Sequence, residues 1–133
     1  MDIVKKQVPG DAATHESLKI VVDACHHRAY NNGWWHDPKT GLGTSRPVPE
    51  LLCLIHSEIS EALEGYRKDL MDDHIKTRKM VEVELADALI RICDMAKGIG
   101  MDLPGAVLDK LKYNDQRADH KIENRAKDGG KKI

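Results

Sequence analysis

Apolar residues recur at intervals of three and four through four segments of this chain, and turn-forming residues separate those segments. At about 100° per residue, this spacing gathers the apolar side chains on one face of a helix. The segments cover about 14–30, 50–68, 79–97 and 103–117. No segment shows the clear apolar–polar alternation of a half-buried strand. The pattern therefore predicts an all-α protein with four principal helices in a single domain spanning residues 1–133.

Capping and breaking residues predict where these helices begin and end. Thr14 is expected to cap the first helix, and Asn31-Asn32-Gly33 to end it. The stretch 34–49 is rich in glycine and proline and is expected to be a loop. Asp102, just before Leu103-Pro104, predicts the start of the fourth helix. Residues 1–13 and the basic, glycine-containing stretch 118–133 are expected to be loose tails.

Two acidic pairs lie against the apolar faces of the second and third helices. Glu58 and Glu61 are three residues apart, as are Glu84 and Asp87, so each pair shares one side of its helix. Glu58 falls near the middle of the second helix's apolar face, with Glu61 at its edge. Glu84 borders the apolar stripe of the third helix and Asp87 lies just beyond it. The two faces consist of Leu51, Leu54, Ile55, Ala62 and Gly65, and of Val81, Leu85, Ala88, Ile92, Met95 and Ile99.

These inward-facing acids predict a cation between the two helices, because an unpaired buried charge costs several kcal/mol. The alternative is that the acids are simply solvated, as most helical glutamates are. Four carboxylates without a neighbouring Cys or His ligand favour Mg²⁺, or Mn²⁺ in its place, over Zn²⁺. A di-iron bundle would need Glu-x-x-His motifs, and the chain has none. Open positions on such a metal would suit phosphate oxygens.

Composition narrows the function classes. A net charge of -1 provides no global field for nucleic acid, and there is no apolar run of bilayer length. The N-terminus lacks the apolar core of a signal peptide, so we expect a cytoplasmic protein. Cys25, Cys53 and Cys93 are expected to be free thiols. The chain has no Phe and only 4% aromatic residues, so its core is thin and self-association would bury more apolar surface.

Two further groups are candidates for substrate binding. Lys110, Asn114 and Arg117 share one helical face and suit a polyphosphate, although a solvated charged face is the alternative. Trp34, Trp35 and His36 lie in the long loop, where aromatic rings can stack on a nucleobase or cover the core. His36-Asp37 does not fit an HD-type phosphohydrolase, whose His and Asp project from helices.

Over about residues 50–131 the chain resembles the MazG-like, all-α nucleoside triphosphate pyrophosphohydrolases. The resemblance rests on the pair Glu58-x-x-Glu61, the string ELADALIRI that contains Glu84 and Asp87, the run Lys110-x-x-x-Asn114-x-x-Arg117, and the later Gly-Gly-Lys. It implies a bundle completed by oligomerisation, as a homodimer or homotetramer.

The resemblance also implies roles for these residues. Glu58, Glu61, Glu84 and Asp87 would hold Mg²⁺, while Lys110, Asn114 and Arg117 would steady phosphates or sugar. Trp34, Trp35 and His36 would contact the base. The expected reaction is hydrolysis of a (d)NTP to a (d)NMP and pyrophosphate by a metal-activated water.

One residue departs from the family pattern. Many members carry an acid where this chain has Ser57. A second or third metal ion that needs this carboxylate would lack a ligand here. Glu61 and Glu64 are the candidate catalytic residues, and both are candidates for the general base. The alternative function is a non-catalytic, helical dimer module that binds metal and nucleotide.

Overall fold

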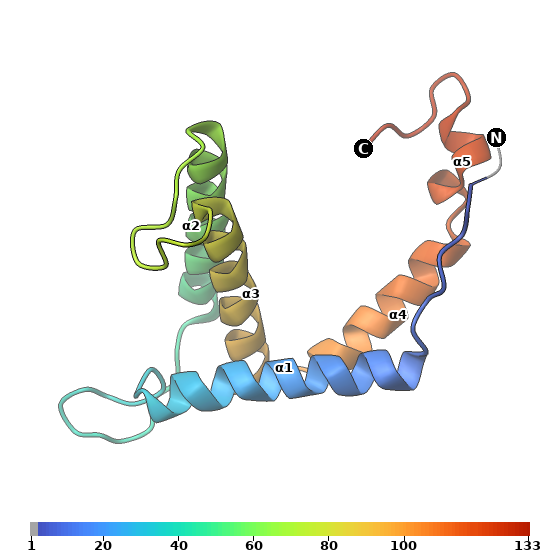
Figure 1. Ribbon diagram of the computed structural model, residues 1–133. Coiled ribbons are helices and arrows are strands. Elements are labelled where there is room, and N and C mark those ends of the chain that lie inside the picture. Colours follow the sequence, from blue (N-terminus) through green and yellow to red (C-terminus); the bar gives the residue numbers. More distant parts are fainter. Residues whose placement is uncertain (1–2) are drawn as a thin grey trace. The chain divides into compact units, whose positions relative to one another are not determined.

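The computed structural model describes residues 3–133, and within them the protein is all-helical (Figure 1). Four long helices follow one another along the chain, with a 3-10 turn and a short helix after them. Their bounds are α1 Asp11–Asn31, α2 Val48–Arg67, α3 Met80–Gly98, α4 Leu103–Gln116, η1 Ala118–His120 and α5 Ile122–Arg125. The predicted all-α class and its four principal helices are therefore confirmed.

The helix ends follow local chemistry, with one difference from expectation. The carboxylate of Asp102 accepts a hydrogen bond from the Gly105 amide at 3.0 Å and caps α4 as predicted. Gly100 follows α3 with a φ of 78°, a left-handed conformation that glycine adopts without steric cost. The first helix starts at Asp11 instead of Thr14, whose hydroxyl donates to the Gly10 carbonyl at 3.0 Å.

The described chain forms two compact units. One contains residues 20–101, and the other contains residues 102–133 with the N-terminal part up to residue 19, so α1 contributes to both. In the second of these units, Lys112 on α4 pairs with Asp11 on α1 at 3.1 Å. The candidate acidic pairs all belong to the unit 20–101, whereas Lys110, Asn114 and Arg117 belong to the other.

In the unit 20–101, α2 and α3 lie side by side and pack against each other (Figure 1). Its buried cluster joins Trp35 from the long loop, Leu51 from α2 and Met95 from α3. Ala29, Ile55 and Ile99 pack around that cluster. The loop is thus attached to the helix pair through a tryptophan.

Part of the predicted apolar surface remains exposed in the single chain. Leu85, assigned to the apolar stripe of α3, is 52% exposed, and Leu89 one turn later is 51% exposed. The stripe predicted for α3 is therefore wider than the part of it that α2 covers. No helix within residues 3–133 is long and apolar enough to cross a membrane.

Candidate metal centre

Three of the predicted acids converge between α2 and α3. Glu58 from α2, and Glu84 and Asp87 from α3, each offer a carboxylate oxygen within 4.8 Å of the others. Glu58 is 6% exposed and Glu84 is 8% exposed, while Asp87 lies at the solvent edge. The three-residue spacing places Glu84 and Asp87 on one flank of α3, and the packing of α2 brings Glu58 to the same place. The result is an oxygen-rich group suited to a hard cation.

Burial and mutual repulsion make this group reluctant to ionise. Burial, followed by a hydrogen bond with Glu58 and the charge of Glu61, raises the pKa of Glu84 to about 7. Burial and the charge of Glu58 also raise the pKa of Asp87, against the opposing effect of Arg91. Like charges held together in a partly buried site favour the uptake of a proton or a cation. The cluster is therefore electrostatically incomplete when all its acids are ionised.

An arginine supplies part of the missing positive charge. Arg91 Nε on α3 donates to Glu58 Oε1 at 2.5 Å, and the Arg91 side chain is 41% exposed. The inward-facing acids predicted a cation here, but their pattern did not point to Arg91. Arg91 lies four residues after Asp87 and seven after Glu84, a spacing that places all three on one helical face. That periodicity was the signal available in the sequence.

Asp72, in the connector between α2 and α3, is a further acid that sequence analysis did not assign. It is 6% exposed, and its carboxylate accepts hydrogen bonds from the amides of His74 and Ile75, the first at 3.0 Å. Its charge adds to the rise in the pKa of Asp87. The connector therefore contributes negative charge to the site, and no periodic pattern marked it because it lies outside the helices.

The remaining candidates on α2 lie outside the converged group. Glu61 is exposed and acts on Glu84 through its charge alone. Glu64 forms ion pairs with Lys68 and, at 3.4 Å, with Arg67. The Lys68 contact lowers the pKa of Glu64, so this carboxylate is a weak proton acceptor. Of the two candidate bases, Glu61 has the fewer competing partners.

The two loop tryptophans occupy different environments. Trp35 is 7% exposed, and its Nε1 donates to Asp94 Oδ1 on α3 at 2.8 Å. Trp34 is 64% exposed and presents its ring to the outside. The ring of His36 lies edge-on to that of Tyr30, with centroids 4.5 Å apart. Trp35 therefore anchors the loop, which leaves Trp34 as the ring open to a ligand.

Asp94 connects this loop to α1 and α3. Besides Trp35, it has His26 Nδ1 at 2.8 Å from Oδ1 and Arg46 Nη1 at 3.8 Å from Oδ2. Asp94 is 8% exposed. Neither Asp94 nor Arg46 was among the predicted site residues, although Asp94 follows Asp87 by seven residues and so lies on the same side of α3.

A cavity of about 210 Å³ joins the loop to the acidic group. Its walls come from α1, the loop and α3, and include Asp87 and Arg91 of the acidic group. The lining residues are Ala29, Trp34, Arg46, Asp87, Ile90, Arg91 and Asp94.

The predicted polyphosphate face belongs to the other unit. Lys110 Nζ lies 4.7 Å, and the Arg117 guanidinium 5.9 Å, from the centre of the Tyr113 ring. Arg117 also binds Asp119 bidentately at 2.9 and 2.6 Å. The Asn114 side-chain oxygen is buried and has no hydrogen-bond partner among residues 3–133. Lys110 and Arg117 are therefore drawn together around one tyrosine, and Arg117 is already neutralised by Asp119.

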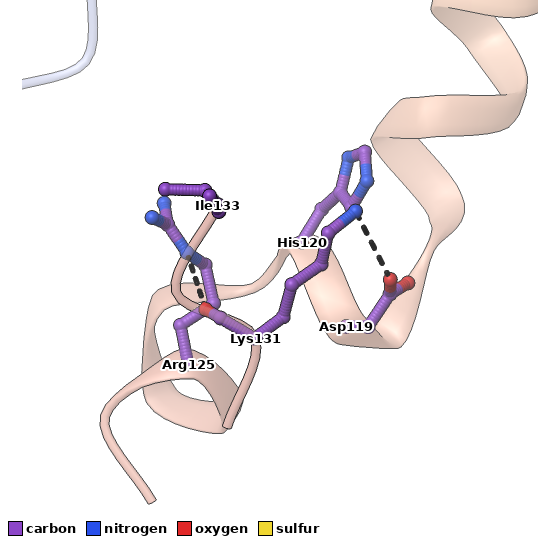
Figure 2. A pocket seen from close by; sticks show the side chains of 5 residues that line it. All are labelled: Asp119, His120, Arg125, Lys131 and Ile133. Carbon is purple, nitrogen blue, oxygen red and sulfur yellow. Dashed lines mark hydrogen bonds and ion pairs between the residues drawn. The ribbon is translucent and has the colours of Figure 1, made fainter. Parts of the chain in front are cut away.

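The expected C-terminal tail is partly folded and forms a second cavity, of about 310 Å³. Figure 2 shows Arg125 Nε reaching the Lys131 carbonyl, at 3.3 Å, and Lys131 Nζ facing Asp119, at 3.9 Å. His120 and Ile133 complete its lining. These contacts hold the tail, so Arg125 and Lys131 at this cavity already have partners within the tail.

Comparison of the chain with protein families, with curated proteins and with solved structures gave no match. The site is therefore interpreted from its own chemistry. Three carboxylates, two of them buried, fit a divalent cation with oxygen preference such as Mg²⁺. Arg91 is the one group in the cluster that would have to yield some of its contact with Glu58.

Proposed function

We propose that this chain is a Mg²⁺-dependent nucleoside triphosphate pyrophosphohydrolase of the MazG-like type, which converts a (d)NTP to a (d)NMP and pyrophosphate. The observation that carries the proposal is the convergence of Glu58, Glu84 and Asp87 within 4.8 Å on two packed helices. The pKa of Glu84, raised to about 7 by burial and by its acidic neighbours, supports it because a bound cation would stabilise the ionised carboxylate against both effects.

Each residue has a defined part in this proposal. Glu58, Glu84 and Asp87 would hold the metal, with Mn²⁺ as an alternative to Mg²⁺. The bound metal would supply charge neutralisation for the phosphates and acidify water. Glu61, exposed beside the cluster, would accept the proton of the water that attacks the α-phosphorus. As the new P–O bond forms, the bond to the bridging oxygen breaks and pyrophosphate leaves. Arg91 would move from Glu58 towards a phosphate oxygen.

The same proposal includes self-association as a homodimer or homotetramer. α2 exposes an apolar stripe of Leu52, Ile59, Leu63 and Tyr66, spaced by seven, four and three residues along one face. α3 exposes Leu85 and Leu89, one turn apart. Exposed apolar stripes of this kind are typical of surfaces that pack against another helix. A second copy of the helix pair would cover them.

A second candidate is a non-catalytic module that binds metal and nucleotide. The observation that favours it is the Arg91–Glu58 contact at 2.5 Å, which satisfies one acid of the cluster without a metal. In that case Arg91 and the acids would serve binding only.

A pyrophosphate-release screen over canonical and modified NTPs and dNTPs, each with Mg²⁺ or Mn²⁺, separates these functions. Release that requires the metal is the expected result. Nucleotide binding without release would favour the module. If there is neither release nor a rise in melting temperature on adding Mg²⁺ with nucleotide, both functions fail, because ligand binding to the folded state must stabilise it.

A further inference from the structure

Arg46 is a largely buried arginine whose hydrogen-bond donors are unused. Its side chain is 16% exposed, and its closest charged partner, Asp94 Oδ2, is 3.8 Å away. Within residues 3–133 its guanidinium donates no side-chain hydrogen bond; it contacts the rings of Trp34 and Trp35, 5.9 and 5.7 Å from their centres. A guanidinium carries five N–H donors. None of the Arg46 nitrogens is among the buried side-chain atoms without a partner in residues 3–133, and Arg46 lines a cavity, so these donors are open to the acceptors of a ligand bound there.

The Arg46 guanidinium is held in place by the elements around it. The carboxylate of Asp94 lies 3.8 Å from Arg46 Nη1. The same carboxylate accepts a hydrogen bond from Trp35 Nε1 at 2.8 Å, and this places the Trp35 ring beside the guanidinium. The Trp34 ring, whose centre is 5.9 Å from the guanidinium, belongs to a side chain that is 64% exposed. A fixed planar fork beside an exposed aromatic ring suits a flat heterocycle that stacks on the ring and accepts from the fork.

The cavity lined by Arg46 fits part of a nucleotide better than a whole one. Its volume of about 210 Å³ is below the roughly 300–1,000 Å³ of pockets that enclose a complete small ligand. Asp87 and Arg91 line it too, so it opens beside the acidic group where phosphates would bind. A base in the cavity and phosphates at the acids would therefore belong to one ligand.

The charges in the cavity favour a neutral heterocycle over a phosphate. Arg46 and Arg91 contribute two positive charges, and Asp87 and Asp94 contribute two negative charges. A phosphate would meet two carboxylates in a lining with no net charge. A nucleobase carries no charge to repel, and Ala29 and Ile90 supply apolar wall for its ring.

We propose that Arg46 determines base specificity at this site and selects bases with two adjacent acceptors, guanine or cytosine. Guanine presents O6 and N7 side by side, the pair to which arginine binds bidentately, and cytosine presents N3 and O2. In adenine, the ring acceptors N1 and N7 each lie beside the amino group, which is a donor. In uracil and thymine, an N–H group lies between the two carbonyl oxygens. Neither arrangement offers the arginine fork two adjacent acceptors on these edges. The inference rests on the proposed function, because it places the phosphates at the acidic group.

The test uses the full chain and the 5′-monophosphates of guanosine, cytidine, adenosine and uridine with Mg²⁺. Trp34 and Trp35 are the two tryptophans of the chain, so quenching of tryptophan fluorescence reports ligand at this cavity, and calorimetry confirms the dissociation constants. Guanosine and cytidine monophosphates should bind about tenfold more tightly than the other two. Equal affinities, or no binding of any of the four, would overturn the proposal.

Arg46→Gln should abolish this preference, and Arg46→Lys should weaken it, because a lysine keeps the charge without the bidentate fork. Arg78→Gln is the matched control, since Arg78 is 63% exposed and pairs with the surface residue Glu82; its base preference should equal that of the wild type. If Arg46→Gln does not fold, the role of Arg46 is tested by comparing the base preference of Arg46→Lys with that of the wild type. A preference that survives both substitutions would overturn the role of Arg46.

Pyrophosphate release from the four corresponding triphosphates, measured in parallel, separates this inference from the proposed function. A base preference in binding without any release supports the specificity role and contradicts the catalytic proposal. Pyrophosphate release combined with equal affinities for all four bases supports the catalytic proposal and contradicts the specificity role of Arg46.

Discussion

Two acidic sites lie about two turns apart on α3, one formed by Asp94 and the other by Glu84 and Asp87, and their partners differ. Asp94 accepts from Trp35 and faces His26 and Arg46, so groups from α1 and from the long loop surround one acid. Glu84 and Asp87 instead face Glu58, and Arg91 is the cation that contacts this group. A buried acid that has donors holds structure together, whereas buried acids that face one another store repulsion that a cation relieves. The first group is suited to stability and the second to ligand binding.

The largest expected effect tests the ligand-binding group. Asp87→Asn should reduce metal-dependent pyrophosphate release by about 10³-fold or more, because the cluster loses a charged metal ligand. Circular dichroism should show an unchanged fold, since the substitution removes one of several repelling acids. Glu82→Gln, on the exposed side of α3, is the control and should keep full activity. Full activity in Asp87→Asn would contradict the assigned centre.

Removing Asp94 should reduce the stability of the fold. Asp94→Ala should lower the free energy of unfolding by about 3 kcal/mol, because Trp35 Nε1 loses its acceptor inside the core and Arg46 loses its counter-ion. Urea unfolding followed by tryptophan fluorescence measures this change. Asp73→Ala, at an exposed position in the connector, should change stability little. Equal stability of the two variants would show that Asp94 does not anchor the loop.

A smaller effect should come from the contact between Trp35 and the end of α3. A Cβ at Gly98 would overlap the Trp35 ring, so Gly98→Ala should cost about 2 kcal/mol by displacing the ring from its place beside Asp94. Gly43→Ala is the control, since a Cβ there meets no atom within 4 Å. Thermal unfolding compares the two variants. If the Gly98→Ala protein is as stable as its control, the Trp35 ring does not pack against Gly98.

The smallest effect concerns pH. The pKa of Glu84 rises from 4.5 to about 7 on folding, so between these values the folded chain keeps a proton that the unfolded chain has lost. Stability without metal should therefore fall as pH increases through this window, by about 1 kcal/mol for a screened interaction. Urea unfolding at pH 5 and pH 7.5 measures the change.

Glu84→Gln should remove most of this pH dependence, and saturating Mg²⁺ should offset it by binding the ionised cluster. A wild-type protein that became more stable over the same pH window would have the opposite linkage. That result would contradict the repulsion between Glu84 and its neighbours.

Sequence periodicity predicted the acidic cluster of Glu58, Glu84 and Asp87 better than it predicted the contacts of Asp94. Glu58 interrupts one apolar stripe, while Glu84 borders the other and Asp87 lies just beyond it on the same flank, so the positions of these acids in the sequence predict that they face the helix pair. Glu61 belonged to the same predicted set, but it is exposed and lies outside the converged group. One helix turn of difference decides whether an acid at the edge of a stripe meets the partner helix.

The contacts of Asp94 were not predictable in the same way. Trp35 and Asp94 are separated by 59 residues, and Arg46 lies in a loop whose conformation no repeating pattern specifies. Which of the two tryptophans is buried likewise depended on the tertiary structure. Trp34 and Trp35 are identical neighbours in the loop, and they differ only in the direction in which their side chains point. Long-range pairs of this kind arise when helices and loop are brought together.

The amino-acid sequence by itself determined the helical class, the approximate helix ends and the side of each helix on which the acids lie, because these depend on a period of 3.6 residues and on local caps. Tertiary packing alone decided which acids meet, that Arg91 joins them, and that Asp94 holds Trp35 beside Arg46. A helical period specifies directions about one axis, but it does not specify the rotation and register of one helix against another, and the site depends on both.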